Sequence, residues 1–275
     1  IRRTYDLVPG NVYHFEPNNC RHNYSSCNEE YTIDHYERHE YKGGVKFKRL
    51  AIDIEVYSSE EGHPFPRASV DGNVVNLVGI VTSDGRKYRL VLNHPHVNPN
   101  EPDLQVFETE IELLCGIRDI IIREDPDFIL SYNGKNFDFP YMIERANRTL
   151  LNRFCFFGRL WMHPIQHGYS LTCPGRVMLD LCEYYKSQAG LLKFTSYTLK
   201  TVAKESNVGV DKIDLEYQEQ FEIWEGKRSP VEMKVFIDYV TVDAELCILL
   251  DDRHGVSGSM MALAHITQAN PQTLL

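Results

Sequence analysis

Apolar positions along the chain take on a regular pattern from about residue 50. Mostly apolar runs at residues 50–56, 74–82 and 87–92 predict three strands. The sequence Ser83-Asp84-Gly85 between the last two is typical of a hairpin turn. We therefore expect these two strands to pair with each other.

Helical spacing begins further along the chain. Residues 105–123 carry apolar side chains three and four positions apart, which predicts a helix. Asp125-Pro126 ends it, because proline disfavours helix at the preceding residue. The remaining predicted elements are a strand at 128–132, a helix at 139–150, a strand at 176–181, a helix at 197–205, a polar linker at 206–227 and a long helix at 230–253.

This order of elements indicates the fold class. Strands followed by alternating helices and strands are typical of an α/β fold, in which helices flank a mixed sheet. Residues 1–48 are polar and aromatic, and Pro17-Asn18-Asn19 signals a turn, so we expect a short β-rich segment there. No run approaches the roughly 18 apolar residues that a membrane helix needs, and we expect no membrane partner.

Composition and charge bear on the class of protein and on its cellular compartment. The chain has 275 residues, 43% of them hydrophobic, which is enough for a buried core. Its seven cysteines are odd in number and scattered, which indicates reduced thiols and an intracellular protein of the cytoplasm or nucleus. The net charge of −10 is unusual for a protein that contacts phosphate. A basic run exists (Lys42, Lys46, Lys48, Arg49), but we favour a solvated strand edge over a phosphate site there.

Carboxylates mark the first predicted strand. Asp53 and Glu55 are two positions apart, so both side chains project from one face, while Ile52 and Ile54 point into the core. Taken alone, such a pair is more often a charge that protects a sheet edge than a metal site.

Further acidic and phenolic groups lie at two later positions. Asp138 stands where the helix after the strand at 128–132 begins, so a helix N-cap is its common alternative role. Tyr239 and Asp243 are four apart on the last helix and share one face. Their ordinary alternative is a solvated turn, or a tyrosine packed over the core.

Together these residues indicate a chemistry that none indicates alone. Four converging carboxylates repel one another strongly unless cations lie between them. Carboxylate oxygens suit Mg²⁺ or Mn²⁺, and a pair of such ions activates water against a phosphodiester. The sequence therefore predicts a metal-dependent nuclease with two divalent ions.

The same segments resemble the three exonuclease motifs of family B DNA polymerases, nearest to the archaeal-type members. Asp53-Ile54-Glu55 is similar to the first motif, residues 132–141 to nearly all of the second, and Tyr239-Val240-Thr241-Val242-Asp243 to the third. Residues 175–181 and 196–199 also look like family segments. The resemblance implies an RNase H-like fold and a 3′→5′ proofreading exonuclease.

It also implies a role for each residue. Asp53, Glu55 and Asp243 would hold one metal ion. Asp53 and Asp138, the latter through water, would hold the second. Tyr239 would orient the attacking water or bond the scissile phosphate.

The implied substrate is the 3′ end of single-stranded or frayed primer–template DNA. Asn133 and Phe137 would help to seat the last nucleotides. A site of this kind binds strand ends by stacking and backbone contact, and a mismatched end frays at low cost.

The resemblance further divides the chain into two parts. Residues 1–48 would be the remnant of a polymerase N-terminal domain, and residues 49–275 the exonuclease domain. No second set of acidic motifs for polymerisation precedes Leu275, so the chain is expected to be a piece of a longer polymerase. The rest of that chain and a sliding clamp are the further partners expected.

Three alternatives stay open. The same site could act on RNA, or the chain could be a catalytically silent template-binding module, although none of the four carboxylates is missing. A structural zinc site is the third, and we favour surface polar positions over it because the first spacing is too long for common zinc motifs. Its candidate ligands are Cys20, His22, Cys27, His35 and His39.

Overall fold

The computed structural model describes residues 12–18, 32–39, 46–62, 65–149, 158–159, 165–167 and 170–274. The first two described segments are strands, β1 (Val12–Asn18) and β2 (Thr32–His39), which pair antiparallel in a sheet of their own. The register shifts between Phe15 and Pro17, because proline has no N–H to give to the ladder. The N-terminal part therefore contains the β structure that was expected.

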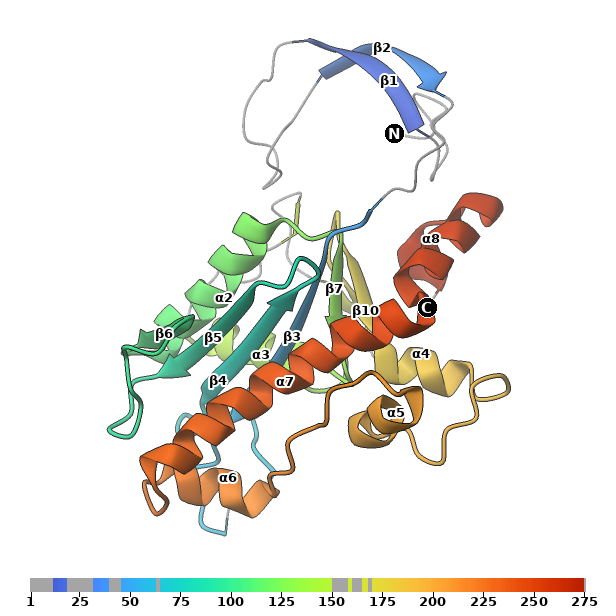
Figure 1. Cartoon of the computed structure of the whole chain (residues 1–275). Helices are drawn as coiled ribbons and strands as arrows, with labels where there is room; N and C mark the ends of the chain where they lie inside the picture. The colour runs from blue at the N-terminus through green and yellow to red at the C-terminus, as the bar shows by residue number, and fades with distance from the viewer. Residues whose placement is uncertain are drawn as a thin grey trace.

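A six-stranded sheet forms the centre of the molecule, with the strand order β10-β7-β3-β4-β5-β6 (Figure 1). Strands β10, β7 and β3 run parallel, β4 is antiparallel to both β3 and β5, and β6 is parallel to β5. The strands are β3 (Arg49–Val56), β4 (Val75–Thr82), β5 (Lys87–Leu92), β6 (Leu104–Phe107), β7 (Phe128–Ser131) and β10 (Val177–Asp180).

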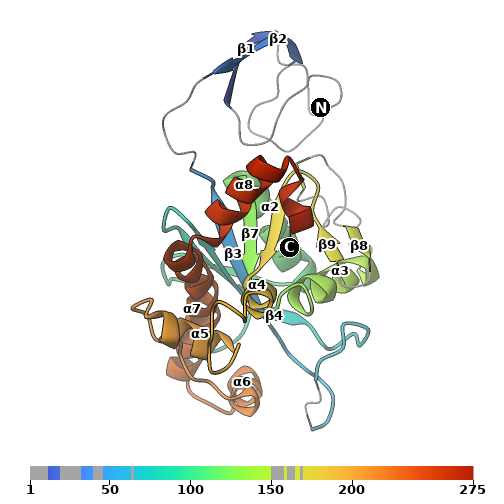
Figure 2. The same cartoon turned by 90° about the vertical axis from the view of Figure 1, so that its right-hand side faces the viewer.

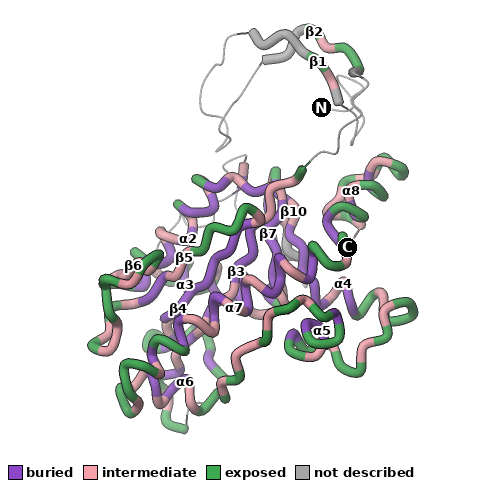
Figure 3. Tube along the Cα trace, viewed as in Figure 1, coloured by how far each residue is buried: buried purple, intermediate pink, exposed green. Residues whose placement is uncertain are grey.

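Helices cover both faces of this sheet. One face packs against α2 (Glu110–Glu124) and α3 (Asp138–Arg148) through apolar side chains of alternate strand positions. The other packs against α7 (Pro230–His254), which crosses β3 and β4 diagonally, and Figure 2 shows the sheet between α7 and α3. Every residue of β4 is buried, as expected for a strand covered on both faces (Figure 3). This mixed sheet with flanking helices confirms the predicted RNase H-like α/β fold.

Short elements complete the described structure. Helices α4 (Leu181–Ser187) and α5 (Leu199–Ser206) pack on the α7 side, and α6 (Tyr217–Trp224) precedes α7. The chain then continues into α8 (Val256–Thr267) and a 3₁₀ turn, η1 (Pro271–Leu274). A small hairpin joins β8 (Ile165–His167) to β9 (Ser170–Thr172). No helix in the described part of the chain is both long and apolar enough to span a bilayer.

Two sequence predictions were wrong. The helix predicted at 105–123 begins five residues later, because Thr109 and Glu112 form a capping box and the preceding residues pair with β5 as β6. The polar linker at 206–227 contains α6, whose apolar residues Phe221 and Ile223 are buried. Eight residues give too short a pattern for periodicity to separate a helix from a linker.

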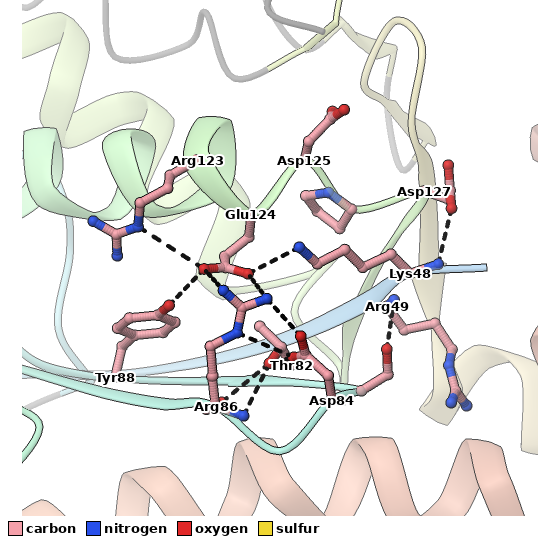
Figure 4. A network of polar contacts seen from close by, with 12 residues as sticks. Lys48, Arg49, Thr82, Asp84, Arg86, Tyr88, Arg123, Glu124, Asp125 and Asp127 are labelled. Carbon is pink, nitrogen blue, oxygen red and sulfur yellow. Dashed lines mark hydrogen bonds and ion pairs between the residues drawn. The ribbon is translucent and has the colours of Figure 1, made fainter. Parts of the chain in front are cut away.

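Two residues of the basic run before β3 have acidic partners. Lys48 Nζ lies 3.0 Å from the buried carboxylate of Glu124 (Figure 4). The same carboxylate forms an ion pair with Arg86 and accepts a hydrogen bond from the Tyr88 hydroxyl. Arg49 donates to two aspartates of α7, Asp251 at 2.7 Å and Asp252 at 2.6 Å. This region therefore ties the start of β3 to α2 and α7. The solvated strand edge expected here is wrong, because β3 lies inside the sheet and these side chains form ion pairs with buried carboxylates. Lys42 lies outside the described residues.

Candidate active site

The first site residues stand on β3, as the alternation of the strand requires. Ile52 and Ile54 are buried against α2 and α3, whereas Asp53 and Glu55 project from the opposite face, toward α7. Both carboxylates are half-buried in the middle of a sheet. They therefore do not protect a sheet edge, since β3 has a neighbour on each side.

Asp138 reaches β3 from the start of α3. It is the first residue of the helix, while Phe137 occupies the N-cap position and makes no side-chain cap bond. Asp138 Oδ1 instead accepts the N–H of Ile54 at 3.2 Å. Pairing between β3 and β7 ends at Ala51, so this N–H lies beyond their ladder and would otherwise lack that partner. The N-cap alternative for Asp138 is thus wrong, and its carboxylate is buried beside Asp53 and Glu55.

The third group comes from α7. Tyr239 and Asp243 are one turn apart on the side of the helix that faces the sheet. The helix comes this close because Gly79 of β4, the cross-strand partner of Asp53, has no side chain. A Cβ built at Gly79 would stand 2.7 Å from the Val240 carbonyl carbon and 2.8 Å from Thr241 Cα. Gly79 thereby permits the approach of Asp243 to Asp53.

A lysine completes the group. Lys212 lies in the irregular segment before α6, and its Nζ forms a short ion pair with Asp243 Oδ2. The same ammonium is 3.4 Å from the Tyr239 hydroxyl and 4.8 Å from the centre of the Tyr239 ring. Sequence reasoning missed this residue, since a single lysine in an irregular stretch gives no periodic signal.

The electrostatics are those of crowded, buried carboxylates. Burial raises the pKa of Asp53 well above its usual range, and the charges of Asp138, Asp243 and Glu55 raise it further. Burial and then Asp243 raise the pKa of Glu55 to about 8. Burial raises the pKa of Asp138 to about 7, although two backbone N–H groups oppose this. Without a cation these carboxyls therefore tend to keep protons near neutral pH, because their full ionisation would place more negative charge here than Lys212 alone balances.

The donor set fits a divalent cation. Asp243 Oδ1 is buried and has no hydrogen-bond partner among the described residues, an arrangement that costs free energy unless a cation or water meets it. Carboxylate oxygens are the ligands that Mg²⁺ and Mn²⁺ prefer. As the side chains lie, no three acidic, histidine or cysteine groups in the described ranges are arranged around a single ion. Lys212 holds the second oxygen of Asp243 in this arrangement.

The two residues expected to seat DNA lie on the loop between β7 and α3. Asn133 is exposed, adopts a left-handed conformation with φ of 64°, and accepts a bond from Asn136 at 3.0 Å. Phe137 is half-buried between Tyr141 and Phe65, with ring centroids 5.4 Å and 5.1 Å away. The Phe65 side chain is 69% exposed, so this aromatic group opens to solvent beside Asp138.

The candidate zinc ligands receive no support from the described residues. His35 is exposed and lies 3.6 Å from Glu37, whereas Cys20, His22 and Cys27 are outside the described ranges. The side chain of His39 is likewise outside the description.

Comparison with known proteins adds an independent line of evidence. The profile of the DNA polymerase family B exonuclease domain matches residues 3–202. The DNA polymerase delta catalytic subunit of Arabidopsis thaliana is 32% identical over 189 residues, which cover 62% of this chain and 17% of that protein. A DNA polymerase of Thermococcus litoralis is 30% identical over 209 residues, covering 74% of this chain and 11% of that protein.

A solved structure shows the same fold. The family B DNA polymerase from the hyperthermophilic archaeon Pyrobaculum calidifontis superposes with a TM-score of 0.70 at 22% identity, covering 97% of this chain and 32% of the other. The match covers less than a fifth of the length of each of the two sequence relatives named above. Because the family profile covers more than half of the chain, the protein belongs to the family B DNA polymerases and carries their exonuclease domain.

Proposed function

We propose that this domain is a 3′→5′ proofreading exonuclease that hydrolyses the terminal phosphodiester of single-stranded or frayed DNA with two divalent metal ions. One observation carries the proposal. Four carboxylates from β3, α3 and α7, two half-buried and two buried, interact electrostatically, and one buried oxygen of Asp243 has no partner among the described residues. Such a group needs cations to be stable at neutral pH.

The acidic residues divide between the two ions. Asp53, Glu55 and Asp243 would hold one, and Asp53 with Asp138 would hold the other. Bound Mg²⁺ or Mn²⁺ supplies a nucleophilic water at neutral pH and neutralises charge on the phosphoryl oxygens. The protein side chains keep these oxygen ligands in place and limit the access of bulk water.

Tyr239 contributes a proton donor. Burial, followed by the charges of Glu55 and Asp243, raises the pKa of its phenol far above neutrality. The hydroxyl therefore stays protonated at pH 7 and can donate a hydrogen bond to the attacking water or to a phosphate oxygen.

Lys212 provides a counter-charge that responds to metal. Without metal its ammonium neutralises Asp243. Coordination by Asp243 would release the ammonium beside the Tyr239 hydroxyl, where a cation attracts an incoming phosphate.

The surroundings favour a single-stranded end. The Phe137 ring packs at a tilt against the buried Tyr141 and against the exposed Phe65, next to Asp138 in the chain, and exposed aromatic rings bind unpaired bases by stacking. Asn133, exposed on the same loop, would contact the terminal nucleotide. In the intact polymerase, residues 49–275 would form this exonuclease domain. Residues 1–48 would be the remnant, in this chain, of the N-terminal domain. The rest of the polymerase would deliver the primer end, and a sliding clamp is a further partner.

The proposal is tested by incubating the protein with a 5′-labelled single-stranded DNA oligonucleotide and Mg²⁺ or Mn²⁺, with EDTA as control. The expected result is a metal-dependent ladder that shortens from the 3′ end. Immediate release of the 5′-labelled nucleotide would show that cleavage runs from the 5′ end instead. An RNA oligonucleotide of the same sequence, cut faster than the DNA, would favour an RNA exonuclease. Binding of the DNA without cleavage would favour a silent template-binding module.

A further inference from the structure

A fifth acidic residue, Asp180, lies behind the candidate site at the end of β10. It was not among the predicted site residues. Its side chain is buried, with the residue 4% exposed, and its charge acts on Asp138. Strand β10 is parallel to β7, with Asp180 next to Ser131 in the register, so it reaches the same end of the sheet as the loop that leads to Asp138.

The Asp180 carboxylate accepts four backbone N–H groups, three at Oδ1 and one at Oδ2. Oδ1 accepts from Asn133 at 3.0 Å, and Oδ2 accepts from Lys135 at 3.1 Å. Oδ1 also accepts from Cys182 at 3.0 Å and Glu183 at 3.3 Å, which caps the start of α4. A carboxylate with four N–H donors is not disposed to bind a cation, and it joins two segments about 45 positions apart in the chain.

The segment that it holds makes a tight turn. Asn133 has a left-handed backbone conformation, which asparagine tolerates better than most residues with a side chain. Gly134 passes so close to its neighbours that a Cβ there would stand 2.6 Å from Ser131 Cβ and 3.3 Å from Asp138 Oδ2. The Gly134 carbonyl then accepts the Phe139 N–H at 3.0 Å, which fixes the first turn of α3. The position of the loop and that of Asp138 are therefore linked.

A second tether supports the same loop from the same helix. Lys135 Nζ lies 2.6 Å from Glu183 Oε2 on α4. This pair is partly exposed, so it contributes less than the buried carboxylate.

We propose that Asp180 is a positioning residue: through the N–H groups of Asn133 and Lys135 it sets the loop that places Asp138 at the metal site and presents Asn133 and Phe137 to DNA. This role rests on the proposed exonuclease function. Asp180 touches neither metal nor substrate, and it acts through the loop. Outer groups that orient metal ligands typically change metal affinity about 10- to 100-fold when they are removed.

The variant Asp180→Asn tests the role. Its amide oxygen can still accept the bonds made at Oδ1, but its NH₂ group, in the place of Oδ2, meets the Lys135 N–H, so this loop bond is lost. We expect amide hydrogen exchange at Lys135 to accelerate at least about 10-fold, and more than at Asn133, while exchange in β3 and β4 is unchanged. We expect the affinity for Mn²⁺, measured by calorimetric titration without DNA, to fall about 10-fold. Cleavage should recover in part at high Mn²⁺, because the ligands themselves are intact.

A matched control is Asp251→Asn. Asp251 is equally buried and holds the start of α8 through the N–H and hydroxyl of Ser257, both at 2.7 Å, together with Arg49. This variant should lower stability without changing loop exchange or Mn²⁺ affinity. Equal effects of the two variants would show a general structural role and overturn the proposal.

A second substitution guards against misfolding. Asp180→Ser retains a good N-cap for α4 but is too short to reach the loop. If neither Asp180 variant folds, the residue is needed by the whole fold, and the specific positioning role is wrong. If the wild-type protein binds no Mn²⁺ and cuts no DNA, the proposed function fails, whereas the exchange rates still decide whether Asp180 holds the loop. Unchanged loop exchange and Mn²⁺ affinity in folded Asp180→Asn would overturn the proposal.

Discussion

Asp243 is the residue at which the opposing charges of the site meet. One of its oxygens pairs with Lys212, and the other is buried without a partner among the described residues. Breaking a buried ion pair by removing one partner leaves an uncompensated charge, which is strongly destabilising. A divalent cation would supply the missing compensation. Lys212 and metal can therefore be regarded as alternative counter-charges for the same carboxylate.

The variant Lys212→Met tests this exchange of counter-charges. Without metal we expect the free energy of unfolding to fall by about 3 kcal/mol, because Asp243 loses its cation. With saturating Mn²⁺ the loss should be clearly smaller. Urea unfolding of both proteins, with and without Mn²⁺, measures the difference. An equal loss under the two conditions would mean that metal and Lys212 do not share Asp243.

The phenol of Tyr239 has a different role from the carboxylates. Tyr239→Phe removes one hydrogen-bond donor and leaves every metal ligand in place, so Mn²⁺ affinity should be unchanged. We expect single-turnover cleavage to slow about 100-fold, a typical effect of deleting one donor to a developing charge. A comparison is Tyr57→Phe, which removes another phenol, one that donates to Glu225. Wild-type rates in Tyr239→Phe would exclude the donor role.

The contact between α7 and the sheet depends on Gly79. Its partner across the strands is Asp53, and its missing side chain makes room for the backbone of Val240 and Thr241. Here the packing of two elements sets the separation between two residues of the candidate site that are 190 positions apart, Asp53 and Asp243 (243 − 53).

We expect Gly79→Ala to displace α7 and to cost about 1–3 kcal/mol of stability, the usual price of overpacking. Cleavage should fall much more than stability, because Asp243 moves relative to Asp53. Gly85→Ala is a useful comparison, since a Cβ there meets no atom within 4 Å although its φ of 86° is strained. Thermal unfolding and cleavage rates of the two variants decide the matter. If cleavage by Gly79→Ala falls only as far as its loss of stability explains, as in Gly85→Ala, then Gly79 does not set the position of Asp243 relative to Asp53.

The same elements show how far the sequence could predict this fold. β3 and α7 were predicted nearly to their observed ends, because an apolar strand and a long helix beginning at Pro230 give strong local signals. β6 was missed, because four half-buried residues next to a helix carry little pattern. Alternation placed Asp53 and Glu55 on one face, and helical spacing paired Tyr239 with Asp243. Lys212 and Asp180 depend on contacts between distant segments, which no local pattern encodes.

At the scale of the whole molecule, the site carboxylates make the stability of the protein depend on pH. In the metal-free folded state, burial and mutual repulsion raise the pKa of Glu55 to about 8 and that of Asp138 to about 7, above the values near 4 of an unfolded chain. The folded state therefore binds more protons between these values. Its stability should fall as pH rises from about 4 to about 8.

Divalent metal should offset this loss. We expect Mn²⁺ to raise the melting temperature more at pH 8 than at pH 6, and EDTA to abolish the gain. At 100 times the dissociation constant, the ion would stabilise the fold by about 2.7 kcal/mol. Differential scanning calorimetry at the two pH values measures the effect. A gain that does not grow with pH would indicate that the ion binds elsewhere than at these carboxylates.

The most direct measurement is single-turnover cleavage of a 5′-labelled single-stranded DNA by the wild-type protein and by Asp53→Asn. Asp53 is the proposed ligand of both ions, and the substitution keeps its shape. Metal ions contribute several kcal/mol to the transition state, so the account predicts a metal-dependent 3′ ladder for the wild type and a rate at least about 1,000-fold lower for the variant. Near-wild-type cleavage by a folded Asp53→Asn protein would contradict the two-metal site.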